Sequence, residues 1–237
     1  MALILNIETA TDICSIALAD ENGIIDFIEN ADGRSHASLL TVLIEDLLKK
    51  NSILVNTLDA IAISKGPGSY TGLRIGVSVS KGLCFGADKK LLAVPTLESM
   101  TDGFVSRFTT KQKEIDKESW FCPMLDARRQ EVYLSFYDIN GNIQVATSAV
   151  ILSEISFEEI LSIRKVYFFG SGSFKFSELI NDENAVFIND FHNSAKDMVK
   201  ISQKLFEQSK FEDIAYFEPY YLKEFLATTP KEKVFKR

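Results

Sequence analysis

Residues 64–86 read SKGPGSYTGLRIGVSVSKGLCFG and hold six of the twelve glycines of the chain. They follow an apolar run, LDAIAIS, that is typical of a buried strand. A glycine-rich loop between a strand and a helix is a common site for a nucleotide phosphate. The P-loop pattern is absent because Leu73 and Arg74 stand where it requires Lys and then Ser or Thr. The dinucleotide pattern is absent because Thr71 takes the place of its third glycine.

The segment GPGS is instead predicted to be a turn that leads into a helix over residues 69–86. Pro67 fixes its own φ, and Ser69 has the side chain of a helix N-cap. Within the helix, Gly72, Gly76 and Ser80 are spaced four residues apart and leave one face nearly bare. Each helical glycine costs about 1 kcal/mol relative to alanine, so close packing is the expected compensation. The neighbour is either the sheet of the chain itself, which we favour for most of these glycines, or the helix of a partner.

The chain as a whole predicts an α/β protein. Its first hundred residues give three strands, a helix, a strand, a helix and a strand, which indicates a hairpin meander that feeds parallel strands. A polar stretch at 111–119 is expected to connect two lobes. Beyond it, residues 121–152 read as three strands with an Asn-Gly hairpin turn. Helices are then expected at 157–163, 174–180 and 194–208, and strands at 165–173 and 185–190.

Composition indicates a globular protein of the cytoplasm. The 237 residues carry a net charge of −7, which disfavours unaided binding to nucleic acid. The basic segment KEKVFKR at the end either touches RNA locally or, as we favour, is solvated. Cys14, Cys84 and Cys122 are widely spaced and fit buried thiols in a reducing compartment. No signal peptide and no apolar run of membrane-spanning length is recognised, so no membrane partner is expected.

Three polar features remain as candidate sites. The turn IETATD at 7–12 offers Glu8, Thr9 and Thr11 to a phosphate or a metal, although an ordinary hairpin turn explains it better. His36 and His192 lie far apart in sequence, and each is better explained as a surface or capping residue. The turn DARRQE at 126–131 is either an anion-binding or docking corner or a polar turn between strands, and both interpretations stay open.

Several motifs together resemble the TsaB (YeaZ) family. They are IETATDICSIAL, RSHASLLTVLIEDLL, GPGSYTGLRIG, AVPTLESM, DARRQEVYLSFYD and EPYYLKEF, and they run in order through nearly the whole chain. The resemblance implies the actin-like ATPase (ASKHA) fold with two RNase H-like lobes. These are expected at 1–108, completed by 212–237, and at 109–211. It also implies a role in making N6-threonylcarbamoyladenosine at position 37 of tRNA, with the catalytic subunit TsaD and the ATPase TsaE as partners. tRNA is expected to be reached indirectly, through the complex.

The resemblance also implies that this chain lacks the chemistry of TsaD. TsaD carries a segment of the form V-N-H-L-E-G-H whose histidines hold a metal, and the matching VPTLESM places Thr96 and Met100 there. We therefore expect no metal site and no catalytic residues. Glu8 stands where TsaB proteins often have Asp, and GSGS at 170–173 matches the adenosine-binding glycines of the wider fold. Residues expected to mark a degenerate nucleotide site are Glu8, Thr9, Thr11, Gly170 and Gly172.

The family pairing surface maps onto two helices, here 35–50 and 69–86. The chain is thus expected to act as a non-catalytic scaffold that positions TsaD, and to form a homodimer when alone. Two alternatives are an ATP-dependent phosphotransferase or hydrolase that uses the residues around Glu8, and a metallopeptidase. Binding of ATP or ADP at the junction of the complex is left open. The expected interface residues are His36, Leu39, Leu40, Leu43, Leu47, Tyr70, Gly72, Leu73, Arg74, Gly76, Val77 and Ser80.

Overall fold

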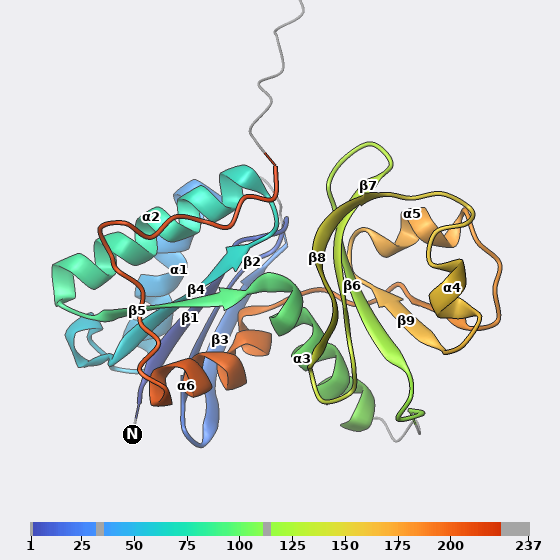
Figure 1. Ribbon diagram of the computed structural model, residues 1–237. Helices are drawn as coiled ribbons and strands as arrows, with labels where there is room; N and C mark the ends of the chain where they lie inside the picture. Colours follow the sequence, from blue (N-terminus) through green and yellow to red (C-terminus); the bar gives the residue numbers. More distant parts are fainter. Residues whose placement is uncertain (1, 32–35, 111–114, 224–237) are drawn as a thin grey trace, which may run out of the picture.

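A computed structural model describes residues 2–31, 36–110 and 115–223. Two five-stranded sheets stand side by side, each with its own helices (Figure 1). The first sheet has the order β3 (Gly23–Asn30), β2 (Cys14–Asp20), β1 (Ile4–Glu8), β4 (Ala60–Gly66) and β5 (Lys90–Pro95). The second has the order β10 (Ala185–Ile188), β9 (Val166–Phe169), β6 (Trp120–Asp126), β7 (Glu131–Tyr137) and β8 (Ile143–Ile151).

The same topology occurs in both sheets. In the first, β1, β2 and β3 form an antiparallel meander, and β4 and β5 continue from β1 in parallel. In the second, β6, β7 and β8 form the meander, and β9 and β10 continue in parallel. The predicted α/β layout is confirmed, including the hairpin turn at Asn140–Gly141, where Gly141 has a φ of +81°. The two sheets therefore repeat one strand order, although the sequence shows no internal repeat of residues.

Helices cover both faces of the first sheet (Figure 1). On one face lie α1 (His36–Lys50) and α2 (Tyr70–Ala87), which bury Leu40, Ile44, Leu47, Val77 and Cys84 against β1, β2 and β4. A short 3-10 turn, η1 (Val55–Thr57), precedes β4. The opposite face packs against η2 (Ala195–Met198) and α6 (Val199–Glu207). The predicted helix over 194–208 is therefore a 3-10 turn followed by an α-helix.

The second sheet is also covered on two faces. α3 (Thr96–Thr110) contributes Leu97, Met100 and Phe104 to an aromatic-rich cluster with Phe121 and Phe169. The other face packs against α4 (Glu158–Leu161) and α5 (Ser173–Ser177), both shorter than predicted. No helix in the described parts of the chain is both long and apolar enough to cross a bilayer.

The packing of the last described part of the chain does not follow the predicted lobe boundaries. The predicted second lobe, 109–211, includes η2 and α6, yet Met198, Val199 and Ile201 pack on the first sheet. Residues 212–223 also lie along the first sheet, where Glu212 bridges Leu91 and the Tyr220 N–H donates to the Lys65 carbonyl (2.7 Å). The lobe boundaries stay a prediction, and this packing favours a first lobe that also takes in 195–223.

The glycines of α2 fall into two groups with opposite surroundings. A Cβ at Gly72 would lie 2.1 Å from the carbonyl oxygen of Thr9, and one at Gly76 would lie 2.2 Å from Thr9 Oγ1. A Cβ at Gly82 or Gly86 would meet nothing within 4 Å. The first pair lets α2 approach the β1–β2 turn, whereas the second pair leaves the outer side of the helix bare.

We predict opposite effects for alanine at these two positions. Gly72→Ala pushes against the rigid backbone of Thr9, so it should lower the free energy of unfolding by roughly 1–3 kcal/mol. Gly82→Ala meets open space and raises helix propensity, so it should increase the free energy of unfolding by roughly 0.5–1 kcal/mol. Urea unfolding of both variants measures the difference. Equal effects would contradict the packing of α2 on Thr9.

Candidate functional site

The glycine-rich loop is closed by the chain itself. The Ser69 side chain accepts the Gly72 N–H at 3.2 Å, so the predicted N-cap of α2 is confirmed. The Ser69 N–H donates to the carbonyl of Ala10 at 2.7 Å. A Cβ at Gly68 would lie 2.4 Å from that same carbonyl oxygen. The loop therefore contacts the β1–β2 turn where a phosphate-binding loop would need open space for its ligand.

Glu8 ends β1 and is fully buried. Its Oε1 accepts the Ala10 N–H at 2.6 Å, whereas Oε2 has no hydrogen-bond partner among the described residues. Burial raises the pKa of Glu8 from 4.5 to about 7, although the hydrogen bond from Ala10 opposes the shift. Ser64 and Asn193 also lower this pKa, and the nearby Asp197 raises it further. The carboxyl group is thus held in the interior and is half-protonated near neutral pH.

The threonines of the same turn bond to neighbouring segments. The Thr9 N–H donates to Ser64 Oγ at 3.4 Å, and Thr11 Oγ1 donates to Asn193 Oδ1 at 2.9 Å. His36 Nε2 lies 2.9 Å from the Thr11 carbonyl oxygen, so this histidine joins the start of α1 to the turn. The structure brings Glu8, Thr9 and Thr11 together, but their polar atoms face protein. The sequence offered no sign of Asn193, because it lies 182 residues from Thr11.

An ion pair between a buried carboxylate and a partly exposed arginine lies beside Glu8. Arg107 of α3 donates to both carboxylate oxygens of Asp197 at 2.5 Å and to the His192 carbonyl at 3.1 Å. Its guanidinium also stacks over Phe191, 4.7 Å from the ring centroid. Burial raises the pKa of Asp197 from 3.8 to about 6, although the charge of Arg107 opposes that shift. This pair joins α3 to η2 and was not predicted, since its two residues are 90 positions apart.

The residues at the two expected metal positions are part of the packing. Thr96 is buried, and its Oγ1 accepts the Gly66 N–H at 3.1 Å. Met100 is buried in the cluster around Phe104, with its Cε 2.6 Å from where a Gly170 Cβ would stand. A hydroxyl and a thioether used in this way do not fit the metal that TsaD carries. Within residues 2–31, 36–110 and 115–223, no group of three or more His, Cys, Asp or Glu could hold a metal ion.

The second-lobe glycines serve close packing as well. Gly170 has a φ of +94°, and a Cβ there would lie 2.5 Å from the Met124 carbonyl oxygen. A Cβ at Gly172 would lie 2.8 Å from Val132 Cγ1. These glycines therefore let the β9–α5 loop contact β6 and β7. Their assignment to a degenerate nucleotide site stays a prediction.

The expected interface residues separate into buried and accessible groups. α1 and α2 do share one face of the first sheet, as expected, but many of the predicted side chains point into the core. Seven are buried within the chain and cannot form a surface: Leu40, Leu47, Gly72, Leu73, Gly76, Val77 and Ser80. Five are at least partly accessible: His36, Leu39, Leu43, Tyr70 and Arg74. The burial on α2 follows from the packing of its Gly72–Gly76 side on Thr9, and Leu40 and Leu47 of α1 pack in the same core; a helical spacing alone does not reveal which side faces inward. The accessible residues stay a predicted interface.

The outward side of α1 and α2 carries residues that the sequence analysis did not select. Phe85 is 84% exposed and Val42 is 47% exposed. Gly82 and Gly86 stand beside Phe85 with open space around them. One sequence feature could have indicated that Phe85 is exposed: it falls outside the apolar stripe of Leu73, Val77 and Cys84, which is the buried side of the helix. We call Val42, Gly82, Phe85 and Gly86 the outer face.

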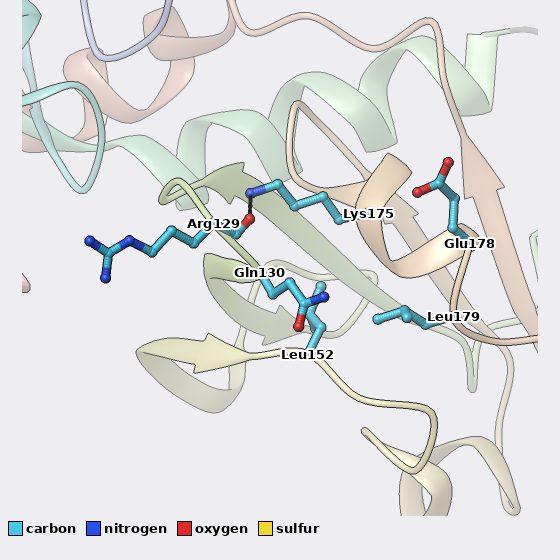
Figure 2. A pocket seen from close by; sticks show the side chains of 6 residues that line it. All are labelled: Arg129, Gln130, Leu152, Lys175, Glu178 and Leu179. Atoms are coloured by element: carbon cyan, nitrogen blue, oxygen red, sulfur yellow. Dashed lines mark hydrogen bonds between the residues drawn. The ribbon is translucent and has the colours of Figure 1, made fainter.

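The DARRQE turn between β6 and β7 is held by a lysine of α5. Lys175 Nζ donates to Asp126 Oδ1 at 2.6 Å. It also donates to the Arg129 carbonyl, as Figure 2 shows. Asp126 Oδ1 also accepts the Arg128 N–H at 2.6 Å. Arg128 and Arg129 have φ values of 70° and 55°. A non-glycine residue in this left-handed conformation costs of order 1–3 kcal/mol, which the contacts of the surrounding structure must offset. The sequence did not predict Lys175 at this turn.

Comparison with known proteins agrees with this fold. Residues 27–234 match the family model described as TsaD, tRNA N6-adenosine threonylcarbamoyltransferase. The tRNA threonylcarbamoyladenosine biosynthesis protein TsaB of Escherichia coli (strain K12) is 29% identical over 93% of this chain and 94% of its own length. The TsaB of Bacillus subtilis (strain 168) is 30% identical over 59% of this chain and 57% of its own length.

Solved structures show the same architecture. YeaZ from Pseudomonas aeruginosa superposes with a TM-score of 0.78 at 24% identity, covering 94% of this chain and all of that one. The polyphosphate/ATP-glucomannokinase from Arthrobacter sp. strain KM gives 0.50 at 8% identity, covering 88% of this chain and all of the other, which supports the fold alone. These two sheets therefore define an actin-like α/β fold, as predicted. The chain belongs to the TsaD family and, within it, to the TsaB (YeaZ) group of the tRNA threonylcarbamoyladenosine pathway.

We predict that Glu8 makes stability fall as pH rises. Its pKa is about 7 in the folded chain and near 4.5 when unfolded, so the folded state binds the extra proton between these values. The contribution is complete below pH 4.5 and is lost by about pH 7, a change of roughly 3 kcal/mol. Glu8→Gln mimics the protonated form, so this variant should be more stable than the wild type at pH 8 and lose that advantage at pH 5.

Urea unfolding of both proteins across this pH range is the measurement. Asp197 also has a raised pKa and adds a slope of the same sign in both proteins, which cancels in the difference except for its coupling to the charge of Glu8. Parallel curves for the wild type and Glu8→Gln would contradict the burial of an ionisable Glu8.

Proposed function

We propose that this chain is a non-catalytic subunit that binds and positions the catalytic subunit TsaD in tRNA threonylcarbamoyladenosine synthesis. The observation that carries the proposal is the use of Thr96 and Met100 in packing, at the positions where TsaD has its metal-binding histidines. The closed surroundings of Glu8 support it too, because Glu8 and Thr9 are buried and their side chains are not accessible to a phosphate. TsaE is the further partner in this proposal, and tRNA is reached through the complex.

The outer face is the surface proposed to pair with TsaD. An exposed phenylalanine on a monomer leaves apolar area in water, which association removes. Beside Phe85, Gly82 and Gly86 carry no side chain, so the backbone of a partner helix can approach closely. Since TsaD belongs to the same family as this chain, a surface suited to it also suits a second copy. We therefore propose that the isolated chain forms a homodimer through the same residues.

The accessible members of the predicted interface lie on the same two helices, with Tyr70 and Arg74 in the first turns of α2. Arg74 lies 4.3 Å from the centroid of the Tyr70 ring, and its Nε donates to the Tyr221 hydroxyl at 3.2 Å. Leu39 and Leu43 are half-buried on α1, and Leu43 packs partly on the core. A polar and aromatic rim of this kind around an apolar centre is the usual organisation of a protein interface.

We predict that Phe85→Asp weakens binding to TsaD by at least about tenfold. Burial of a phenylalanine contributes about 1.5–3 kcal/mol, and the aspartate adds a charge that the interface must desolvate. Because the side chain is 84% exposed in the isolated chain, the free energy of unfolding should change little. Isothermal titration calorimetry with the TsaD of the same organism measures the effect.

The matched control is Phe174→Asp, which alters a phenylalanine that is 60% exposed on α5 of the second sheet. It should leave the affinity for TsaD unchanged. Gly82→Leu is a second test, because it favours the helix while it fills the bare outer side of α2. Unchanged affinity for TsaD in both Phe85→Asp and Gly82→Leu would refute the pairing surface.

A further inference from the structure

The β6–β7 turn presents two adjacent arginines without partners. Arg128 and Arg129 are exposed, and neither guanidinium has a hydrogen bond or ion pair with a residue that the structure describes. Beside the turn, Arg129, Gln130, Leu152, Lys175, Glu178 and Leu179 line a small pocket. Figure 2 shows the Arg129 side chain extending away from the other five residues. Both residues have positive φ values and form the tight turn between the two strands. The turn thus offers two planar cations to the surroundings.

The acidic residues of the turn do not neutralise these cations. Asp126 is ion-paired with Lys175 at 2.6 Å, and Glu131 is ion-paired with Lys223. With both carboxylates matched by a lysine, the charges of Arg128 and Arg129 remain in excess. This corner is therefore positive on a chain whose net charge is −7.

The turn is also fixed before any ligand arrives. Lys175 holds the Arg129 carbonyl, and Asp126 holds the Arg128 N–H. The Asp126 N–H in turn donates to Ser171 Oγ at 3.1 Å. Because these bonds use only main-chain atoms of the arginines, both guanidinium groups stay available. A rigid turn loses little conformational entropy when it binds a partner.

One further lysine lies at the turn, and the sequence after it is basic. Lys223 lies against Glu131, the first residue of β7. In the sequence that follows it, four cations outnumber the two acids Glu224 and Glu232. These cations are Lys231, Lys233, Lys236 and Arg237.

We propose that the β6–β7 turn contacts the phosphate backbone of RNA through Arg128 and Arg129. The proposal rests on the proposed function, in which the complex acts on tRNA, and it adds a direct RNA contact from this chain. A planar guanidinium binds a phosphate through two parallel hydrogen bonds, which explains arginine rather than lysine at both positions. An excess of cations over carboxylates at the turn favours a polyanion as its partner.

The test replaces both arginines by glutamine, Arg128→Gln with Arg129→Gln, and measures binding of a labelled, unmodified tRNA transcript. Binding is measured by anisotropy over a series of salt concentrations, for the isolated chain and for its complex with TsaD. The double variant should bind tRNA roughly tenfold more weakly, and the slope of log K against log salt should shrink by about one to two. The matched control, Lys117→Gln with Lys165→Gln, removes two exposed cations from the opposite end of the same sheet and should bind tRNA normally.

Binding to TsaD is measured separately for each variant by calorimetry. Weaker tRNA binding with normal TsaD binding supports the RNA contact. Unchanged tRNA affinity, an equal loss in the lysine control, or wild-type protein that binds no tRNA in either form would overturn it. Loss of TsaD binding with normal tRNA binding would also overturn it and assign the turn to an acidic protein surface. If the wild-type chain does not bind TsaD, only the proposed function is refuted, because tRNA binding by the isolated chain still tests the contact through Arg128 and Arg129.

Discussion

The close approach of α2 to the β1–β2 turn is the contact on which the rest of the first lobe depends. Gly72 and Gly76 let the helix lie directly on Thr9, where any side chain would collide with it. That approach closes the space between the glycine-rich loop and the β1–β2 turn, while Glu8 is buried on the opposite face of the sheet, near Asn193 and Asp197. It also fixes the rotation of α2 about its axis, so that Gly82 and Phe85 point outward. One steric constraint thus accounts both for a closed ligand position and for an accessible apolar surface.

Much of the fold was predictable because its signals are local. The apolar runs at β1, β2 and β4, the leucine spacing of α1 and the Ser69 cap each lie within a few residues of the feature they determine. The orientation of α2 was not predictable in the same way. Gly72, Gly76, Gly82 and Gly86 look alike in sequence, and only Thr9, more than sixty residues away, distinguishes the packed pair from the open pair. The burial of the five predicted interface residues on α2 follows from that single missing fact.

The site residues that sequence reasoning missed share this dependence on distant segments. Asn193 meets Thr11, Asp197 meets Arg107, and Lys175 meets Asp126 across separations of 182, 90 and 49 residues. No periodic spacing in the sequence links these partners, because they belong to different elements that meet only in the folded chain. What the sequence could provide was a list of polar turns. The structure decides which turns are closed by the chain and which, like the one between β6 and β7, keep charged groups free.

The two proposed surfaces lie where the chain has already satisfied its own packing. Phe85 and Gly82 project from a helix whose opposite side makes the core contacts, and Arg128 and Arg129 contribute only main-chain atoms to their turn. Substitution of these side chains therefore removes little from the folded state. The residues around Glu8 are the reverse, because Thr9 bonds to Ser64 and packs on α2, and Asn193 bonds to Thr11. In this chain the residues around Glu8 are part of the core, whereas the two proposed binding surfaces consist of side chains that folding does not need.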